Sequence, residues 1–301
     1  MKTRLGPDGL HIFDRRTGLN LLFDEVQVEE SEWSSAPRQV SLALTNLCDL
    51  HCAYCYAPKH RATLNADVLA DWLIEIDQAG CLGVGFGGGE PTLHAQFAEI
   101  CRYAANKTKL AVTLTTHGHR LNTQLLDKLE GNVHFIRVSV DGVRGTYEKN
   151  RNRPYANLLA RLRDARAHTQ LGINVIVNDQ TVDELDELSD LAHEIDASEI
   201  LLLPQRATAS VPAASHMAGR KMSLWVAGYA GRVRLAVSEE ASGGLMTCNP
   251  LPLEKALRSY VHVTASGVVK ASSYAAVGIE VGAEGLLAAI HQLGEMNRGV
   301  H

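Results

Sequence analysis

The chain has 301 residues, and at roughly 150 residues per domain this length allows one large domain or two small ones. Apolar residues make up 46% of the chain and charged residues 21%, proportions that exclude intrinsic disorder, collagen-like repeats and a coiled coil. The 29 Lys and Arg residues against 34 Asp and Glu residues give a formal net charge of −5. A chain this mildly acidic has no global attraction to nucleic acid or to an anionic membrane.

Targeting signals and cysteine content indicate the compartment. The sequence contains no run of about 18 uncharged apolar residues, so no transmembrane helix is expected. The N-terminal segment MKTRLGPDGLHIFDRR has no apolar run behind its charges, so no signal peptide is expected either. Six cysteines are too few for a disulfide scaffold in a chain of this length. We therefore expect a cytoplasmic protein that has no membrane partner.

The first two thirds of the chain alternate between strand and helix patterns. Residues 10–26 predict an N-terminal β-hairpin, and residues 27–38 predict a polar linker. Apolar, β-branched runs then predict six strands, at 39–45, 82–86, 111–116, 135–140, 172–177 and 199–203. Apolar residues at helical spacing predict helices between them, among others at 66–79, 95–105 and 181–195. Such alternation predicts an α/β fold, a partial (β/α)6 TIM barrel that falls short of the eight units needed for closure.

The pattern changes after the sixth predicted strand. Residues 207–219 are small and polar and predict a loop, which a helical stretch and a short strand at 233–237 follow. Residues 260–272 predict a second β-hairpin, and residues 285–297 predict a C-terminal helix. We therefore expect three parts, which are an N-terminal hairpin and linker at 1–38, the partial barrel at 39–244 and a small α/β extension at 245–301.

Three of the six cysteines lie within eight residues. Cys48, Cys52 and Cys55 follow the first predicted barrel strand in the segment TNLCDLHCAYCYAPK, at the edge where α/β barrels build their active sites. Three thiolates on one loop can hold three corners of an iron–sulfur cubane and leave the fourth iron open, as a catalytic metal site requires. The alternative is a zinc site with His51 or a distant residue as the fourth ligand. Zinc motifs usually contain a second paired knuckle, and this sequence has no partner CxxC.

This triad resembles the signature of the radical S-adenosylmethionine (SAM) superfamily, Cys-x3-Cys-x-aromatic-Cys, with Tyr54 as the aromatic residue. The resemblance covers roughly residues 39–205, because similar motifs follow the successive strands. FGGGEPTL contains the Gly-Gly-Glu-Pro motif, and TLTTHG is similar to Thr-x-Thr-Asn-Gly with His117 in place of Asn. VSVDG, with Ser139 and Asp141, precedes YEKNR with Arg151, and the fifth strand ends at Asn178.

The resemblance implies that the three cysteines bind a [4Fe–4S] cluster and that the other motifs bind SAM. A glycine-rich turn lets main-chain carbonyls approach the amino group of SAM, and a carboxylate beside it would complete the charge match. Arg151 is expected to pair with the carboxylate of SAM, and Ser139 with that carboxylate or the ribose. His117 leaves the ribose contact open, since the family has Asn there. The residues expected to bind SAM are Tyr54, Gly88, Gly89, Glu90, Thr115, His117, Ser139, Arg151 and Asn178.

The segment that begins at Cys248 resembles the start of the SPASM or twitch extension of peptide-modifying radical SAM enzymes. In that extension further cysteines hold auxiliary clusters, but here Ser272 and Ser273 stand where a ligand would be, and no cysteine follows Cys248. We therefore expect an extension without an auxiliary cluster. Cys248 is then either a thiol that returns a hydrogen atom to a substrate radical or a buried packing residue.

These features predict an enzyme in which the cluster cleaves SAM to a 5′-deoxyadenosyl radical, and this radical abstracts hydrogen from the substrate. The SPASM-like tail favours a ribosomally made peptide or protein as the substrate. A small metabolite or nucleotide is the alternative, because auxiliary cysteines are missing. A non-catalytic metal-binding module is the third hypothesis. The resemblance also implies an electron donor such as flavodoxin or ferredoxin.

Overall fold

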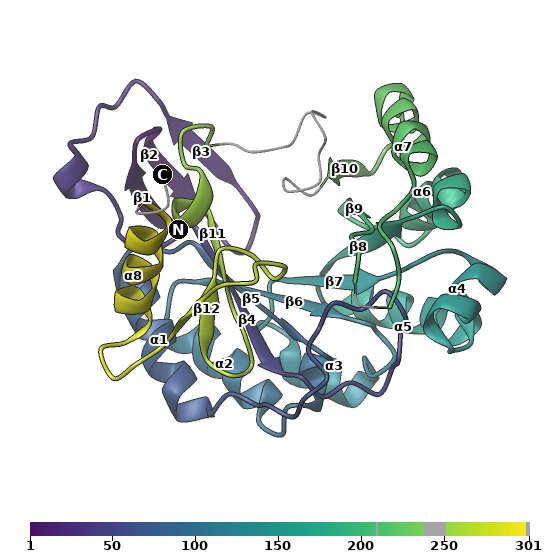
Figure 1. The fold of residues 1–301 in the computed structure, drawn as a ribbon, viewed down its shortest axis with the longest axis horizontal. Helices are drawn as coiled ribbons and strands as arrows, with labels where there is room; N and C mark the ends of the chain where they lie inside the picture. The colour runs from purple at the N-terminus through teal and green to yellow at the C-terminus, as the bar shows by residue number, and fades with distance from the viewer. Residues whose placement is uncertain (209, 238–250, 299–301) are drawn as a thin grey trace.

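One ten-stranded sheet dominates the fold of the computed structural model, which describes residues 1–208, 210–237 and 251–298 (Figure 1). Its strands are β4 (Gln39–Thr45), β5 (Gly83–Gly88), β6 (Ala111–Thr116), β7 (Phe135–Ser139), β8 (Gln170–Val177), β9 (Glu199–Pro204), β10 (Arg234–Val237), β11 (Tyr260–Val263), β12 (Val268–Lys270) and β13 (Ile279–Glu280). Their order is β10-β9-β8-β7-β6-β5-β4-β11-β12-β13, so within the described residues the barrel stays open between β10 and β13. All neighbours from β10 to β11 are parallel.

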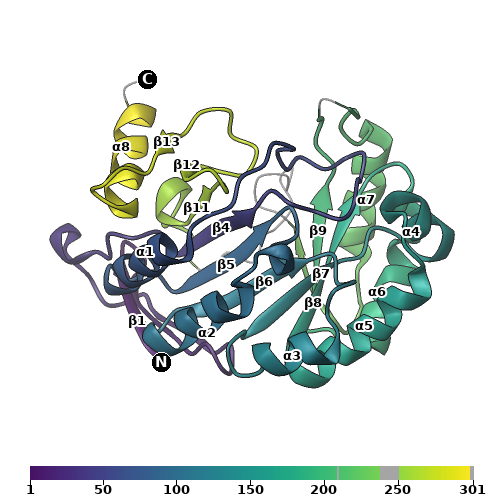
Figure 2. The ribbon, with the colours of Figure 1, turned by 90° about the horizontal axis from the view of Figure 1, so that it is seen from below.

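Helices cover the convex face of this sheet (Figure 2). The α-helices are α1 (Ala66–Gln78), α2 (Phe97–Lys107), α3 (Thr123–Leu129), α4 (Arg144–Arg151), α5 (Tyr155–His168), α6 (Leu185–Glu194), α7 (His216–Gly228) and α8 (Leu286–Arg298). Short 3₁₀ turns lie at Glu30–Glu32, Pro91–Leu93, Thr181–Glu184 and Ala256–Arg258. Alternate residues of β4 to β9, such as Val112 and Leu114 of β6, are fully buried against the helices. In the part of the chain that the structure describes, no helix is long and apolar enough to cross a membrane.

The predicted partial barrel is confirmed, and the six predicted strands correspond to β4 through β9. The N-terminal hairpin is present as β2 (Gly9–Phe13) and β3 (Asn20–Phe23). A further strand, β1 (Lys2–Gly6), pairs with β2 and completes a separate three-stranded sheet. Strand β1 was not predicted because Lys2 and Arg4 are residue types typical of exposed positions, whereas both side chains are buried and ion-paired.

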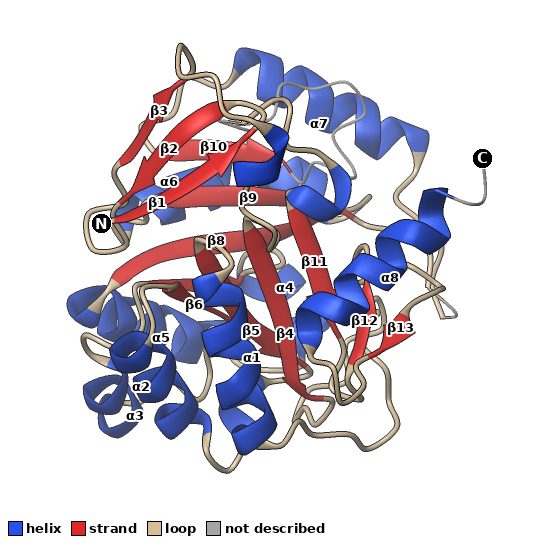
Figure 3. Ribbon diagram, turned by 90° about the vertical axis from the view of Figure 1, so that its left-hand side faces the viewer, coloured by secondary structure: helices blue, strands red, loops and turns tan. Residues whose placement is uncertain are grey.

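The C-terminal segment continues the barrel sheet. The predicted second hairpin is present as β11 and β12, and β11 pairs in parallel with β4, with Tyr260 opposite Gln39. Helix α8 packs on α1, β12 and β13 (Figure 3). Consequently β4, the strand that leads to the three cysteines, has a strand on each side.

A buried ion pair connects the N-terminal sheet to the C-terminal segment. The guanidinium of Arg4 is 1% exposed, and its Nε donates to both carboxylate oxygens of Glu254 at 2.8 and 3.1 Å. Its Nη1 also donates to the main-chain oxygens of Ala36 and Gly80, and its Nη2 to that of Arg258. Because every nitrogen of the guanidinium has a partner, the pair compensates for the loss of hydration of both charges.

Removal of one partner of this pair should destabilise the protein strongly. We expect Arg4→Ala to lower the free energy of unfolding by about 3–5 kcal/mol, because Glu254 would remain buried without its counter-ion. The matched control is Arg163→Ala, since Arg163 pairs with Glu194 at the surface and both side chains are more than 60% exposed. This control should cost less than about 1 kcal/mol. Urea denaturation of both variants measures the difference, and equal losses would contradict the assignment.

Candidate functional site

The three cysteines lie on the loop that follows β4. Within the residues that the structure describes, none of Cys48, Cys52 and Cys55 forms a disulfide, and all three are partly exposed. The main-chain N–H of Leu50 donates to Sγ of Cys48 at 3.4 Å. Burial raises the pKa of the Cys48 and Cys52 thiols, so a bound cation is needed to hold them as thiolates. Three free thiols on one loop therefore fit the donor set of an iron–sulfur cluster.

A positive charge lies beside the second cysteine. Nη1 of Arg151, at the end of α4, donates to Sγ of Cys52 at 3.7 Å, while its Nη2 donates to Oδ2 of Asp141. The hydroxyl of Tyr54 donates to the same Oδ2 at 2.7 Å, and Ile176 N–H donates to Oδ1 at 3.0 Å. Burial and the nearby Asp141 carboxylate raise the pKa of Tyr54, so it keeps its proton. Asp141 thereby joins the cysteine loop to α4 and β8.

The Gly-Gly-Glu turn lies directly against the cysteine loop. Gly88 has a φ of +131°, and a Cβ there would be 2.3 Å from the main-chain oxygen of Thr45. A Cβ at Gly89 would be 2.4 Å from the main-chain oxygen of Leu47. The N–H of Gly89 donates to Thr45 O and that of Glu90 to Leu47 O, both at 2.7 Å. Only glycine fits at these two positions, because the two backbones touch.

The carboxylate of Glu90 has partners different from the one expected. The side chain is fully buried, and its Oε1 accepts from the N–H and hydroxyl of Thr92 and from the hydroxyl of Thr116. Its Oε2 accepts from the N–H of His117 at 3.0 Å. In this arrangement the carboxylate stabilises the turn and connects it to the end of β6.

His117 lies just after β6, and its imidazole is buried between two carboxylates. Its Nε2 is 2.8 Å from Oδ1 of Asp49 and 3.3 Å from Oε2 of Glu90. Partial burial of Asp49 opposes its ionisation, but the hydrogen bond from His117 outweighs this, so the pKa of Asp49 lies below its ordinary value. His117 thus contacts the cysteine loop and the Gly-Gly-Glu turn.

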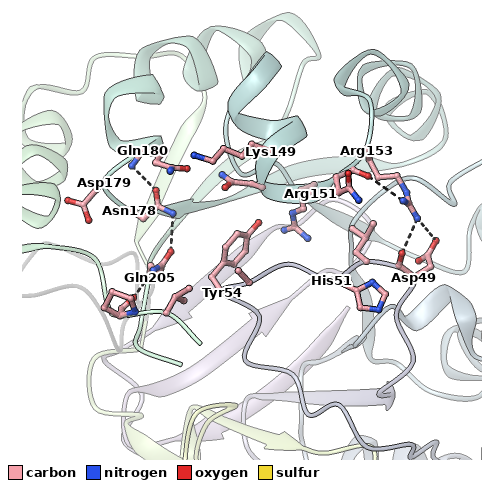
Figure 4. Close-up of a pocket in the computed structure, with 16 residues that line it drawn as sticks. Asp49, His51, Tyr54, Lys149, Arg151, Arg153, Asn178, Asp179, Gln180 and Gln205 are labelled. Carbon is pink, nitrogen blue, oxygen red and sulfur yellow. Dashed lines mark hydrogen bonds and ion pairs between the residues drawn. The ribbon is translucent and has the colours of Figure 1, made fainter. Parts of the chain in front are cut away.

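A pocket of about 490 Å³ opens beside the cysteine loop, a volume typical of small-molecule sites (Figure 4). Of the predicted residues, Tyr54, Arg151 and Asn178 line it. Asn178 Nδ2 donates to Oε1 of Gln205 at 2.9 Å across the pocket wall. The pocket is also lined by residues that were not predicted from the sequence: Asp49, Leu50, Ala53, Lys149, Asn150, Asn152, Arg153, Asp179, Gln180, Gln205, Val211 and Pro212. Their only sequence signal is that most of them follow the carboxyl ends of strands.

The remaining predicted residues lie outside this pocket. Thr115 is exposed and Ser139 half-buried, and both belong to strand faces turned away from the helices. The glycine pair, Glu90 and His117 are likewise absent from the pocket lining. Cys248 lies outside the described residues. The structure therefore brings the thiols, the glycine turn and His117 into one contact network, next to a pocket that Tyr54, Arg151 and Asn178 line.

Comparison with known proteins identifies the family. A family model described as the Radical SAM superfamily matches residues 42–192, a range that includes the three cysteines, the glycine turn and Arg151. The chain belongs to this superfamily. Members of the radical SAM superfamily use a [4Fe–4S] cluster and SAM, so the match favours a cluster over the zinc alternative. Among the described residues, no three His, Cys, Asp or Glu side chains are arranged to hold a single metal ion.

Curated radical SAM relatives share the barrel region with this chain. Mycofactocin maturase MftC of Mycolicibacterium smegmatis is 27% identical over 165 residues, which are 52% of this chain and 42% of that protein. The AdoMet-dependent heme synthase of Methanosarcina barkeri is 28% identical, over 54% of this chain and 49% of the relative. PqqA peptide cyclase of Rhodopseudomonas palustris is 28% identical, over 56% of this chain and 47% of the relative. The chain thus spans less than half the length of these relatives.

A solved structure extends the similarity to the whole fold. SuiB of Streptococcus suis, in the structure bound to precursor peptide SuiA, superposes with a TM-score of 0.75. The superposition covers 98% of this chain and 88% of SuiB, at 11% sequence identity. At this identity the likeness establishes the radical SAM fold and no further property.

The contact at Gly88 predicts a position-specific loss of stability. We expect Gly88→Ala to lower the free energy of unfolding by at least about 1–3 kcal/mol, since it combines backbone strain with a clash against Thr45. The control is Gly87→Ala, one residue earlier, where a Cβ meets nothing within 4 Å. Gly87→Ala should change stability by less than about 0.5 kcal/mol. Urea denaturation of the metal-free proteins distinguishes the two, and a tolerated Gly88→Ala would refute the close approach.

Proposed function

We propose that this protein is a radical SAM enzyme that abstracts a hydrogen atom from a substrate. The observation that carries the proposal is the placement of three free thiols against the Gly-Gly-Glu turn, in a chain of this superfamily. When bound, the [4Fe–4S] cluster supplies the electron that cleaves SAM to a 5′-deoxyadenosyl radical. The protein supplies binding, orientation and exclusion of water.

In this proposal the side chains divide between the cluster and SAM. Cys48, Cys52 and Cys55 hold the cluster. Arg151 balances the thiolate charge at Cys52. Its buried Nε has no hydrogen-bond partner among the described residues and remains available to the carboxylate of SAM. A buried donor without a partner is costly, so a ligand that satisfies it gains affinity.

The other proposed SAM contacts come from residues at or just after the ends of strands. The main chain at Gly88 and Gly89 receives the amino group, because this turn is hydrogen-bonded directly to the loop that would hold the cluster. The main chain at Tyr54 and the amide of Asn178 lie at the pocket and suit the adenine edge. Thr115 and Ser139, on the barrel's inner face, suit the ribose. Glu90 also belongs to the proposed SAM site, and its buried carboxylate shapes the turn through its hydrogen bonds.

We propose a peptide or protein as the substrate. Relatives and structural neighbours support this choice, since they include a peptide cyclase and SuiB with a bound precursor peptide. The open barrel also suits an extended chain, because β10 and β13 remain unpaired edges within the described residues. A small metabolite is the second candidate, and the similarity to a heme synthase supports it.

The wider assignments follow from this chemistry. A one-electron carrier such as flavodoxin or ferredoxin would reduce the cluster, and the cytoplasm would keep the three thiols reduced. We retain the division into residues 1–38, 39–244 and 245–301 as a proposal. Pairing of β11 with β4 supports a close functional link between the last two parts.

Metal analysis tests the cluster. Anoxic reconstitution with iron and sulfide should give about four irons per chain, because one set of three thiolates holds one cubane. Changing Cys48, Cys52 and Cys55 together to Ala should abolish iron binding and the formation of 5′-deoxyadenosine from SAM and dithionite. Cys101→Ala is the control, since this thiol is fully buried in the hydrophobic core. Zinc without charge-transfer absorption, or about eight irons per chain, would refute the proposal.

Product analysis tests the substrate class. The reconstituted protein is incubated anoxically with SAM, dithionite and synthetic peptides that correspond to short reading frames beside its gene. We expect one peptide to accelerate 5′-deoxyadenosine formation and to change in mass, with GTP and Fe-coproporphyrin III as small-molecule controls. Acceleration by either control, with every peptide left unchanged, would establish the second candidate instead.

A further inference from the structure

His117 occupies the position where the family pattern has Asn, and its imidazole contacts two carboxylates. The imidazole is only 4% exposed and does not line the pocket. It lies instead between Asp49, which stands between two of the cysteines, and Glu90 of the glycine turn. The two carboxylates belong to segments that follow different strands, β4 and β5.

The hydrogen bonds determine which nitrogen carries the proton. Nδ1 of His117 accepts the N–H of His119 at 3.1 Å, so the imidazole proton is on Nε2. Nε2 therefore donates to Oδ1 of Asp49 at 2.8 Å, with Oε2 of Glu90 at 3.3 Å on the other side. The main chain of Asp49 is also held in place, since Nη2 of Arg153 donates to the main-chain oxygen of Asp49 at 2.9 Å.

Side-chain reach explains why histidine is needed for this contact. An Asn side chain places its amide nitrogen near the position of Nδ1, whereas Gln extends to the position of Nε2. Only a side chain as long as His or Gln can therefore donate from the end of β6 to Asp49. Glu90 receives other donors from Thr92 and Thr116, so Asp49 is the partner that depends most on His117.

We propose that His117 is a positioning residue that fastens the cluster-binding loop to the Gly-Gly-Glu turn through Asp49. The inference rests on the proposed function, because it assigns a role toward the cluster. In this role His117 limits the opening of the loop between Cys48 and Cys52, and thereby slows loss of the cluster. The ribose contact then belongs to other residues.

Iron release measures this role directly. The reconstituted holoprotein is mixed anoxically with excess EDTA, and the decay of cluster absorbance gives the rate of iron loss. We expect His117→Asn and Asp49→Ala each to release iron roughly ten-fold faster than the wild type, as expected for loss of one hydrogen bond to a charged group. His117→Gln should stay within about three-fold of the wild type, since its amide still reaches Asp49. Asp49→Ala also removes the ion pair of Asp49 with Arg153, whose Nη2 lies 3.6 Å from Oδ2. The double variant should therefore release iron no faster than Asp49→Ala alone, because that change already removes the contact that His117 makes.

A matched control separates positioning from general destabilisation. His11 is also a buried histidine, 3% exposed, and its Nε2 pairs with Asn20 in the remote N-terminal sheet. His11→Asn should leave the rate of iron release unchanged. If His117→Asn does not fold, Asp49→Ala still tests the proposal, because the Asp49 side chain is 36% exposed.

The outcomes distinguish this inference from the proposed function. A wild-type protein that takes up no cluster refutes the proposed function. A wild-type protein with a cluster, whose Asp49→Ala variant releases iron at the wild-type rate, overturns the inference alone. Additive effects in the double variant, or equal rates for His117→Asn and His117→Gln, would also overturn it.

Discussion

The site depends on a main-chain contact that leaves no room for a side chain. Gly88 and Gly89 press against the backbone of Thr45 and Leu47, and two hydrogen bonds of 2.7 Å join the turn to the cysteine loop. Both segments leave the carboxyl ends of neighbouring parallel strands, so the register of β4 and β5 sets their relative position. Thiols and main-chain acceptors are therefore fixed relative to one another before any ligand binds.

Two buried carboxylates extend this contact to the rest of the barrel. Glu90 accepts hydrogen bonds from its own turn and from the end of β6, whereas Asp141 accepts from Tyr54, Arg151 and β8. A buried carboxylate is tolerated only when donors surround it, so each one requires its partners to keep their places. Each buried carboxylate thus links several strand ends through its hydrogen bonds, and the strand ends that carry the site cannot shift independently.

The strands and the thiols that depend on local sequence patterns were predicted correctly. Apolar runs located β4 to β9, and cysteine spacing located the thiols, because both signals lie within a few residues. Strand β1 was not predicted, since Arg4 is buried against Glu254, which lies 250 residues away in the sequence. The hydrogen bonds that the Glu90 carboxylate accepts from Thr116 and His117, more than 25 residues later, have no local signal in the sequence. Helix α7 begins inside the predicted loop because Ser215 caps it, accepting from Ala218 N–H.

The C-terminal segment contributes support to the site through contacts on the cysteine loop. Because β11 pairs with β4, the strand before the cysteines is central in the sheet instead of at its edge. The ring of Tyr56, next to Cys55, lies 4.6 Å from that of Tyr274, and His60 bonds the hydroxyl of Ser266 at 3.1 Å. The guanidinium of Arg206, which follows β9, lies over Tyr274 at 4.7 Å. Arg206, which follows β9, and Tyr274, which follows β12, are therefore in contact beside the cysteine loop, although their strands lie near opposite ends of the open sheet. Through this contact the C-terminal extension supports the open side of the barrel.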